Sequence, residues 1–155
     1  MSAEALHAVS QRTHAVLVQF FDAVQNQQPP EQLAQLFTPD VDWLIPGDAH
    51  AAPWVGRKHG RAGIAEFFHQ WSAHVTSERV QMHQVFVEGQ EAVVTGHQTV
   101  RVLRTGCLIE TEFALLLRVC NGLIAKYHLL QDSLAVHRAA HVPGADAPPL
   151  AGSPQ

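Results

Sequence analysis

The sequence predicts an α+β domain in which helices come first and an antiparallel sheet follows. Apolar residues such as Leu6, Phe20 and Val24 recur at helical spacing near the start of the chain. Four later segments are rich in β-branched residues and are separated by turn signals. Because the helices precede the strands instead of alternating with them, an α+β architecture is favoured over a parallel sheet.

The first two helices are separated by a proline pair. A long amphipathic helix is expected from Leu6 to about Gln27, because Pro29 and Pro30 break the helical pattern. A short second helix is expected over residues 31–37, with proline at its entry.

A short strand and a third helix follow. The strand is expected over residues 41–45 and ends at Pro-Gly, and residues 48–59 are expected to form a loop. The third helix is expected over residues 60–75, with large apolar side chains such as Phe68 and Trp71 along one side.

The four β-rich segments are expected to form the antiparallel part of the sheet. They cover residues 79–87, 92–103, 108–119 and 123–133. Asn121-Gly122 between the last two is a strong hairpin signal. Phe113 to Leu117 is apolar at every position, so both faces of the sheet should be covered there. A homodimer through the open sheet face is the simplest cover for the face without helices.

Composition excludes several other classes of protein. The 155 residues suit a single domain over residues 1–142, with a flexible tail rich in Pro, Gly and Ala over residues 143–155. The net charge of −4 provides no basic stripe for nucleic acid. No apolar run reaches the length of a membrane span, and the N-terminus lacks the pattern of a secretory signal, so a cytoplasmic location is expected. The histidines are scattered outside known ligand spacings, so neither a metal site nor a cofactor is expected.

Several motifs resemble one family. They are Asp40-Val41-Asp42-Trp43 leading to Pro-Gly, Trp54-x-Gly56, Gly60-x-x-Gly-Ile-Ala-Glu-Phe-Phe68, and Asn121-Gly-Leu-Ile-Ala-Lys-Tyr127. Together they resemble the SnoaL-like polyketide cyclases, part of the nuclear transport factor 2-like superfamily that includes ketosteroid isomerase. The resemblance implies a cone-shaped α+β barrel, in which a curved antiparallel sheet wraps around the N-terminal helices and encloses an apolar pocket.

The catalytic residues of ketosteroid isomerase are not matched. That enzyme uses an Asp base with Tyr and protonated Asp as hydrogen-bond donors. In this sequence the resemblance places the base position on Ile45 or Leu44, the tyrosine position near Phe20, and the acidic donor on Ala114. Steroid isomerisation by that mechanism is therefore not expected.

Two other carboxylates are candidates for acid–base catalysis. The same count places Glu112 on one face with Ala114, which the resemblance makes the inward face, and a carboxylate in an apolar pocket has a raised pKa suited to a general acid. Tyr127 and Gln131 are expected to point inward on the final strand, with Tyr127 as partner of Glu112. The alternative is that Glu112 lies at the wet end of its strand.

The second carboxylate, Asp132, ends the last strand. The resemblance to SnoaL-like cyclases suggests an acid–base role for it. Simple alternation places it on the face opposite Gln131, so a bulge would be needed to turn it inward. The alternative is a turn or a helix cap.

The large apolar side chains suggest the kind of ligand. Trp43, Ile45, Phe68 and Trp71, with Trp54 at the rim, would form a flat apolar slot for a polycyclic or terpenoid-like compound, and ordinary core packing is the alternative. Two functions are therefore expected. One is a cofactor-independent isomerase, cyclase or dehydratase acting on a hydrophobic carbonyl compound, and the other is a non-catalytic protein that binds a small apolar ligand.

Overall fold

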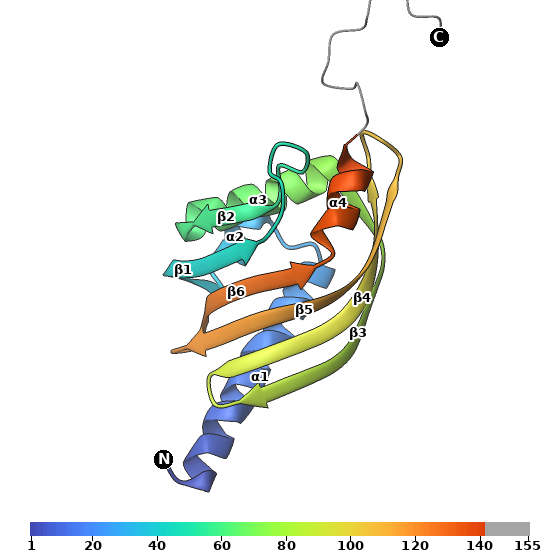
Figure 1. Ribbon diagram of the computed structural model, residues 1–155. Coiled ribbons are helices and arrows are strands. Elements are labelled where there is room, and N and C mark those ends of the chain that lie inside the picture. The colour runs from blue at the N-terminus through green and yellow to red at the C-terminus, as the bar shows by residue number, and fades with distance from the viewer. Residues whose placement is uncertain (142–155) are drawn as a thin grey trace, which may run out of the picture.

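The computed structural model describes residues 1–141, and the tail expected over residues 143–155 lies outside the described residues. Figure 1 shows the elements in order. The described helices are α1 (Ala3–Gln25), α2 (Pro30–Ala34), α3 (Gly60–His74) and α4 (Ser133–Ala140). The described strands are β1 (Phe37–Ile45), β2 (Gly56–His59), β3 (Val75–Glu88), β4 (Glu91–Val102), β5 (Leu108–Cys120) and β6 (Leu123–Gln131).

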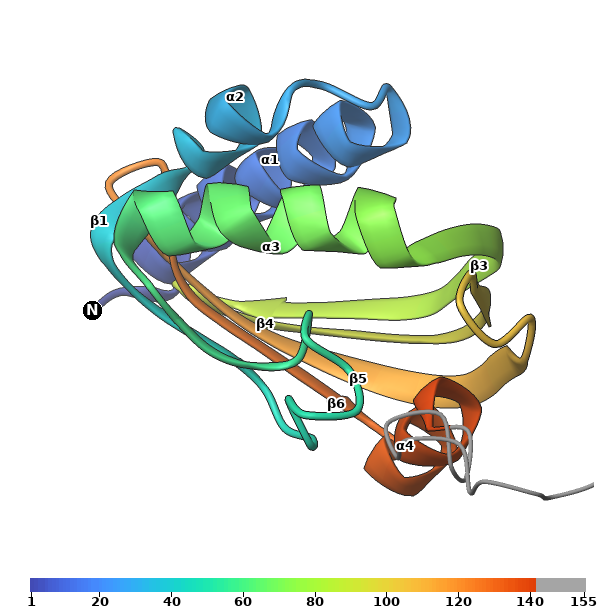
Figure 2. The ribbon, with the colours of Figure 1, turned by 90° about the horizontal axis from the view of Figure 1, so that it is seen from above.

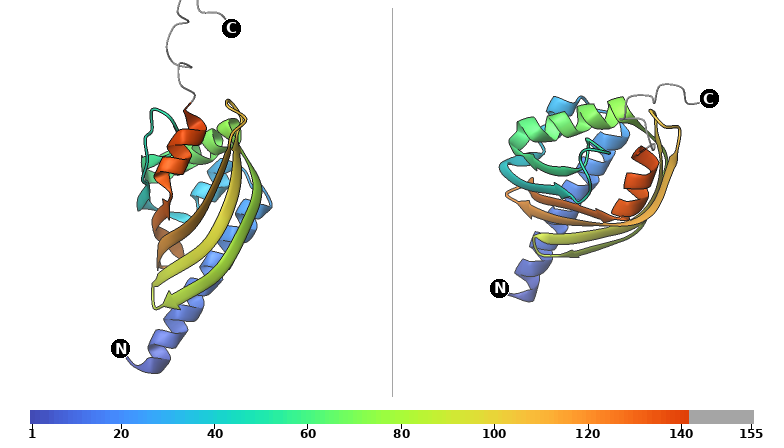
Figure 3. Two further views of the ribbon diagram at one scale, coloured as in Figure 1. Left: turned by 45° about the vertical axis from the view of Figure 1, so that its right-hand side comes forward. Right: turned by 45° about the horizontal axis from the view of Figure 1, so that its top comes forward.

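One six-stranded sheet in the order β2-β1-β6-β5-β4-β3 organises the molecule. Its neighbouring strands are antiparallel except for β1 and β6, which are parallel. Helices α1, α2 and α3 lie on one side of the sheet, which curves toward them (Figure 2). Figure 3 shows this curvature from two further directions. The expected α+β architecture with a curved sheet around the N-terminal helices is confirmed.

Helix α1 is fixed to the turn between β3 and β4. The hydroxyl of Thr13 donates to the carbonyl oxygen of Gly89 at 2.6 Å, and the amide of Gly89 donates to the hydroxyl of Ser10 at 2.8 Å. Leu17 and Phe20 on the same helix are buried against the sheet. These contacts place α1 across one end of the edge strand β3. None of the helices in residues 1–141 is long and apolar enough to span a bilayer.

The two faces of the sheet are defined by alternation of burial. In β4, Val94, Gln98 and Val100 are buried, whereas the odd-numbered residues between them are half-exposed. In β5 the buried side chains are odd-numbered, including Thr111 and Leu115. We call the side that faces the helices the inner face and the opposite side the outer face.

Two elements were not expected from the sequence. The segment expected to be a loop contains β2, which pairs with β1 from Asp42 to Ile45. The strand expected to continue to residue 133 ends at Gln131, and helix α4 follows it. The side chain of Asp132 caps this helix by accepting a hydrogen bond from the amide of Ala135, and an Asp cap favours a helix start.

The expectation that Glu112 and Ala114 face the pocket side is wrong. A tight hairpin at Asn121-Gly122, continued without interruption, would place Glu112 opposite Gln131. The register instead shifts between Arg118 and Val119, which leaves Ala125 as an extra residue in β6 and places Phe113 opposite Gln131. Because a shift of one residue exchanges the faces of a strand, Glu112 and Ala114 lie on the outer face.

Candidate functional site

The candidate site is a group of buried and half-buried side chains on the inner face. Leu115 and Leu117 are buried on this face, and their partners in β6 are Leu129 and Tyr127. Directly opposed residues on neighbouring strands share a face, so these β6 side chains also point toward the helices. We define the inner surface as Gln98, Phe113, Tyr127, Leu129 and Gln131.

Aromatic rings form one end of the inner surface. Trp43 and Tyr127 are register partners in the parallel pair of β1 and β6, and their rings stack with centroids 4.0 Å apart and planes 5° apart. The ring of Phe20 meets Tyr127 edge-on at 6.0 Å. Burial raises the pKa of Tyr127 further above neutral pH, where its protonated hydroxyl can donate a hydrogen bond.

A polar pair forms the other end. The amide nitrogen Nε2 of Gln98 donates to Oε1 of Gln131 at 2.7 Å, across the intervening strand β5. Beside this pair, the hydroxyl of Thr111 accepts from the backbone amide of Asp132 at 3.0 Å. The pair uses the carbonyl oxygen of Gln131 and leaves the amide nitrogen of this residue to donate to another group. The inner surface thus combines apolar rings with neutral hydrogen-bonding groups.

The indole of Trp43 adds a buried donor at the aromatic end. Trp43 is fully buried, and within the described chain its Nε1 has no hydrogen-bond partner. An unpaired buried donor costs stability, and a role in binding is one explanation for keeping such a group.

The remaining residues expected to bind ligand are core residues. Phe20, Ile45, Trp54 and Phe68 are all buried. Trp71 is half-buried and meets Trp54 edge-on with ring centroids 6.4 Å apart. Ordinary core packing therefore accounts for Ile45 and Phe68, and the exposure expected of a rim residue is not seen at Trp54.

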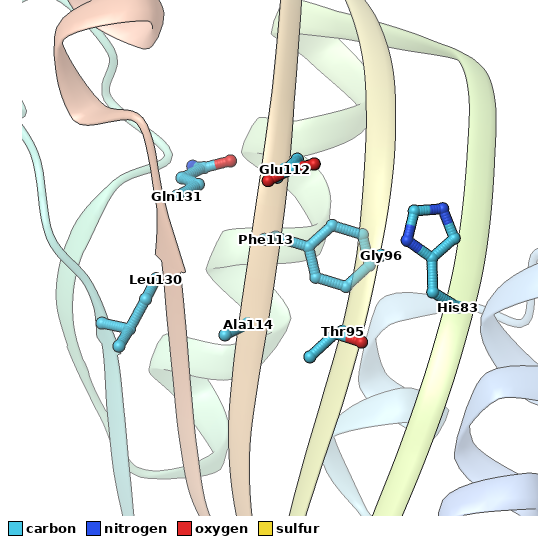
Figure 4. Close-up of a pocket in the computed structure, with 8 residues that line it drawn as sticks. All are labelled: His83, Thr95, Gly96, Glu112, Phe113, Ala114, Leu130 and Gln131. Atoms are coloured by element: carbon cyan, nitrogen blue, oxygen red, sulfur yellow. The ribbon is translucent and has the colours of Figure 1, made fainter.

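Glu112 lies in a hollow on the outer face. The hollow has a volume of about 430 Å³, and its lining includes His83, Thr95, Glu112 and Leu130 together with Phe113 and Gln131 from the inner surface. Figure 4 shows these side chains with the helices behind the sheet. Ala114 lines the same hollow. The structure therefore separates Glu112 from Tyr127, its expected partner, by placing them on opposite faces of the sheet.

A second outer-face group joins β1, β2 and β6. Nε2 of His128 and Nη1 of Arg57 each lie 2.9 Å from Oδ1 of Asp42. The contact with His128, followed by that with Arg57, holds the pKa of Asp42 below its ordinary value. Over the described residues, no three His, Cys, Asp or Glu side chains are grouped in a way that could hold a metal ion.

Asp132 acts in the structure as the cap of α4. Replacing Asp132 by Ala removes this cap and is expected to lower the free energy of unfolding by about 1 kcal/mol, a loss of about 2–4 °C in melting temperature. Thermal denaturation measures the loss, with Leu134→Ala, an exposed change on the same helix, as the control. If the Asp132→Ala protein folded but no longer bound ligand, Asp132 would have to be counted among the binding residues.

Gln98 was missed by sequence reasoning, although the sequence carries a signal for it. Apolar residues occupy alternate positions around it, at Val94, Val100 and Val102. Alternation therefore places Gln98 on the buried face of its strand, and a polar residue in such a row is a candidate for a site.

The comparisons with known proteins agree with this architecture. A family model described as a SnoaL-like domain matches residues 17–127. No curated protein matches the chain. The structure of an NTF2-like protein from Burkholderia xenovorans is 23% identical with a TM-score of 0.74, and the match covers 85% of this chain and 98% of that chain.

Two other solved structures are similar. A candidate isomerase from Rhodopseudomonas palustris is 22% identical with a TM-score of 0.67, over 78% of this chain and 89% of that chain. TerC, co-crystallised with polyporic acid, is 22% identical with a TM-score of 0.71, over 83% of this chain and 98% of that chain. At these identities the likenesses show a shared fold and not a shared activity. Because the family model spans most of the chain, the protein belongs to the SnoaL-like family.

Proposed function

We propose that the protein binds a small, neutral, apolar carbonyl compound on its inner surface. The observation that carries the proposal is the Gln98–Gln131 pair, which sets amide groups among the apolar side chains of Phe113, Leu129 and Tyr127. A half-buried amide that keeps a free N–H group, as Gln131 does, favours a ligand that can accept a hydrogen bond. None of the side chains in this set is charged, which favours a neutral ligand over an anion.

The amide nitrogen of Gln131 is the donor proposed for the ligand carbonyl. Tyr127 lies four positions before Gln131 on the same face of β6. The rings near Tyr127 would hold the apolar body of the ligand. TerC, which has a similar fold, was co-crystallised with polyporic acid. This supports the proposal that a protein of this fold binds a small organic compound.

An isomerase, cyclase or dehydratase activity without a cofactor is the second candidate. The likeness to a candidate isomerase favours it. Donors that bind a carbonyl oxygen also stabilise the negative charge that forms on that oxygen during enolisation. The inner surface contains no carboxylate, so in this version the proton acceptor is water or a second group of the substrate, rather than Glu112 or Asp132.

We also propose that two copies of the chain pair through the outer face. The apolar run in β5 puts Ala114 and Leu116 on this face, and Leu130 beside them is 43% exposed. Beside this patch the charged side chain of Arg118 is paired with Glu91 at 2.6 Å. An apolar centre with a polar rim suits a self-complementary interface.

Native mass spectrometry combined with ligand titration tests these proposals. Prodan is a neutral naphthyl ketone whose emission depends on its surroundings, and it is a suitable probe for the inner surface. We expect one prodan per chain, and the mass of a dimer. Dimer formation without prodan binding would contradict the proposed function, and a monomer that binds prodan would contradict only the proposed interface.

A further inference from the structure

The edge strand β3 carries exposed apolar side chains that face inward. Val80, Met82 and Val85 are register partners of Gln98, Gly96 and Val94, which are buried. Opposed residues share a face, so the three β3 side chains lie on the inner face. Nevertheless Val80 is 52%, Met82 48% and Val85 41% exposed.

The exposure has a simple cause in the placement of the helices. Helix α1 is fixed at one end of β3 through Gly89, and α3 leads directly into the other end at the buried residue Val75. The exposed inward residues lie between these two covered ends. The exposed fractions of these side chains therefore make the middle of β3 a stretch of inner face that solvent reaches. Figure 2 shows the course of β3 relative to α1 and α3.

This stretch leads directly to the inner surface. Met82 is paired with Gly96, Gly96 with Phe113, and Phe113 with Gln131, so the four residues form one row across four strands. Val80 heads a neighbouring row that continues to Gln98 and Thr111. Both members of the Gln98–Gln131 pair are thus reached from the edge strand along the inner face.

We propose that ligands enter over the middle of β3, and that Met82 and Val80 set the width of this passage. The inference rests on the proposed function, because it assumes that a ligand binds at the inner surface. Met82 has an unbranched and flexible side chain, which can move aside and return. These two residues would then determine how large a ligand can pass.

Pairing with a strand from another molecule is a weaker explanation for the exposed edge. The register of β3 against β4 shifts at Glu78 and again at His83. Bulges of this kind interrupt the regular row of backbone groups that an added strand needs. Strand addition at this edge is therefore disfavoured, and it does not explain the exposed apolar side chains of β3.

The rates of prodan binding to the full chain test the passage. Met82→Trp narrows it, and we expect the association and dissociation rates each to fall by about tenfold or more, with the equilibrium constant within about threefold, because an obstacle slows both directions alike. Gln81→Trp is the matched control, since the neighbouring side chain lies on the outer face and is exposed. Met82→Ala is expected to raise both rates.

The outcomes separate this inference from the proposed function. Unchanged association and dissociation rates in both Met82 variants would overturn the proposal that ligands enter over the middle of β3. An equal slowing of these rates by Gln81→Trp would overturn it too. A loss of affinity in Met82→Trp with an unchanged association rate would make Met82 a contact residue and would also overturn it. A wild-type protein that binds no prodan would instead contradict the proposed function. Circular dichroism melting identifies variants that fail to fold. If Met82→Trp does not fold, the rates of Met82→Ala decide whether ligands enter over β3.

Discussion

Replacing Gly96 by Ala is expected to destabilise the fold by about 1–3 kcal/mol, the range for overpacking a filled interior. A β-carbon at this position would lie 2.6 Å from Cζ of Phe113 and would also collide with the backbone carbonyl of Gln81. The ring could move, but the carbonyl belongs to the bulged strand β3 and is fixed by its pairing. In a thermal denaturation curve we expect the melting temperature to fall by about 3–10 °C.

A double variant separates the two collisions. Phe113→Leu removes the ring that lies against Gly96, and it leaves the carbonyl of Gln81 in place. We therefore expect Gly96→Ala to remain destabilising in the Phe113→Leu background, with only part of the loss recovered. Full recovery of the lost stability would mean that the ring of Phe113 alone excludes a side chain at position 96. It would also mean that the bulged part of β3 can move at little cost.

Strong periodic signals in the sequence predicted most of the fold. The apolar residues around Leu17 and Phe20 predicted α1, and β-branched segments between glycine turns predicted β3 to β6. The short strand β2 was missed because it depends on tertiary pairing, and helix α4 was missed because it has only eight residues. Strand β2 has only four residues, and its partner is a strand that also pairs in parallel with β6. Local periodicity contains no information about such partners.

The candidate site was predicted in part, and the facing of β5 shows why. The expected inward positions of Tyr127 and Gln131 agree with the structure, because they follow from alternation within one strand. The expected position of Glu112 required counting across a hairpin, and the extra residue Ala125 reversed the result. A bulge is decided by packing on both strands, so the sequence of one hairpin does not reveal it.

The contact between Asp42 and His128 illustrates a further limit. These residues are far apart in the sequence and become diagonal neighbours only because β1 lies parallel to β6, where the register partner of His128 is Leu44. Nothing in the spacing of the histidines indicates such a pair. By contrast, Gln98 was within reach of sequence reasoning, since alternation alone places it on the buried face.

Replacing Gln131 by Leu is expected to abolish the preference of the protein for a carbonyl ligand. Acetylnaphthalene and ethylnaphthalene have nearly the same shape, and only the first accepts a hydrogen bond. Displacement of prodan measures both affinities. One hydrogen bond contributes about 1 kcal/mol, so we expect the wild type to favour the ketone by about fivefold. In Gln131→Leu the ratio should fall to about one, with ethylnaphthalene bound at least as well as before.

Matched variants show whether the effect belongs to the inner surface. Glu112→Gln, on the outer face, should keep the ligand preference of the wild type. Any catalytic turnover that the wild type shows should also be unchanged in this variant. Gln98→Leu removes the partner that orients Gln131, so it should reduce the preference without abolishing it. If Glu112→Gln lost the preference while Gln131→Leu kept it, the ligand would bind in the outer hollow. The hydrogen bond that selects the ligand would then come from the outer face, where the register shift in β6 places Glu112.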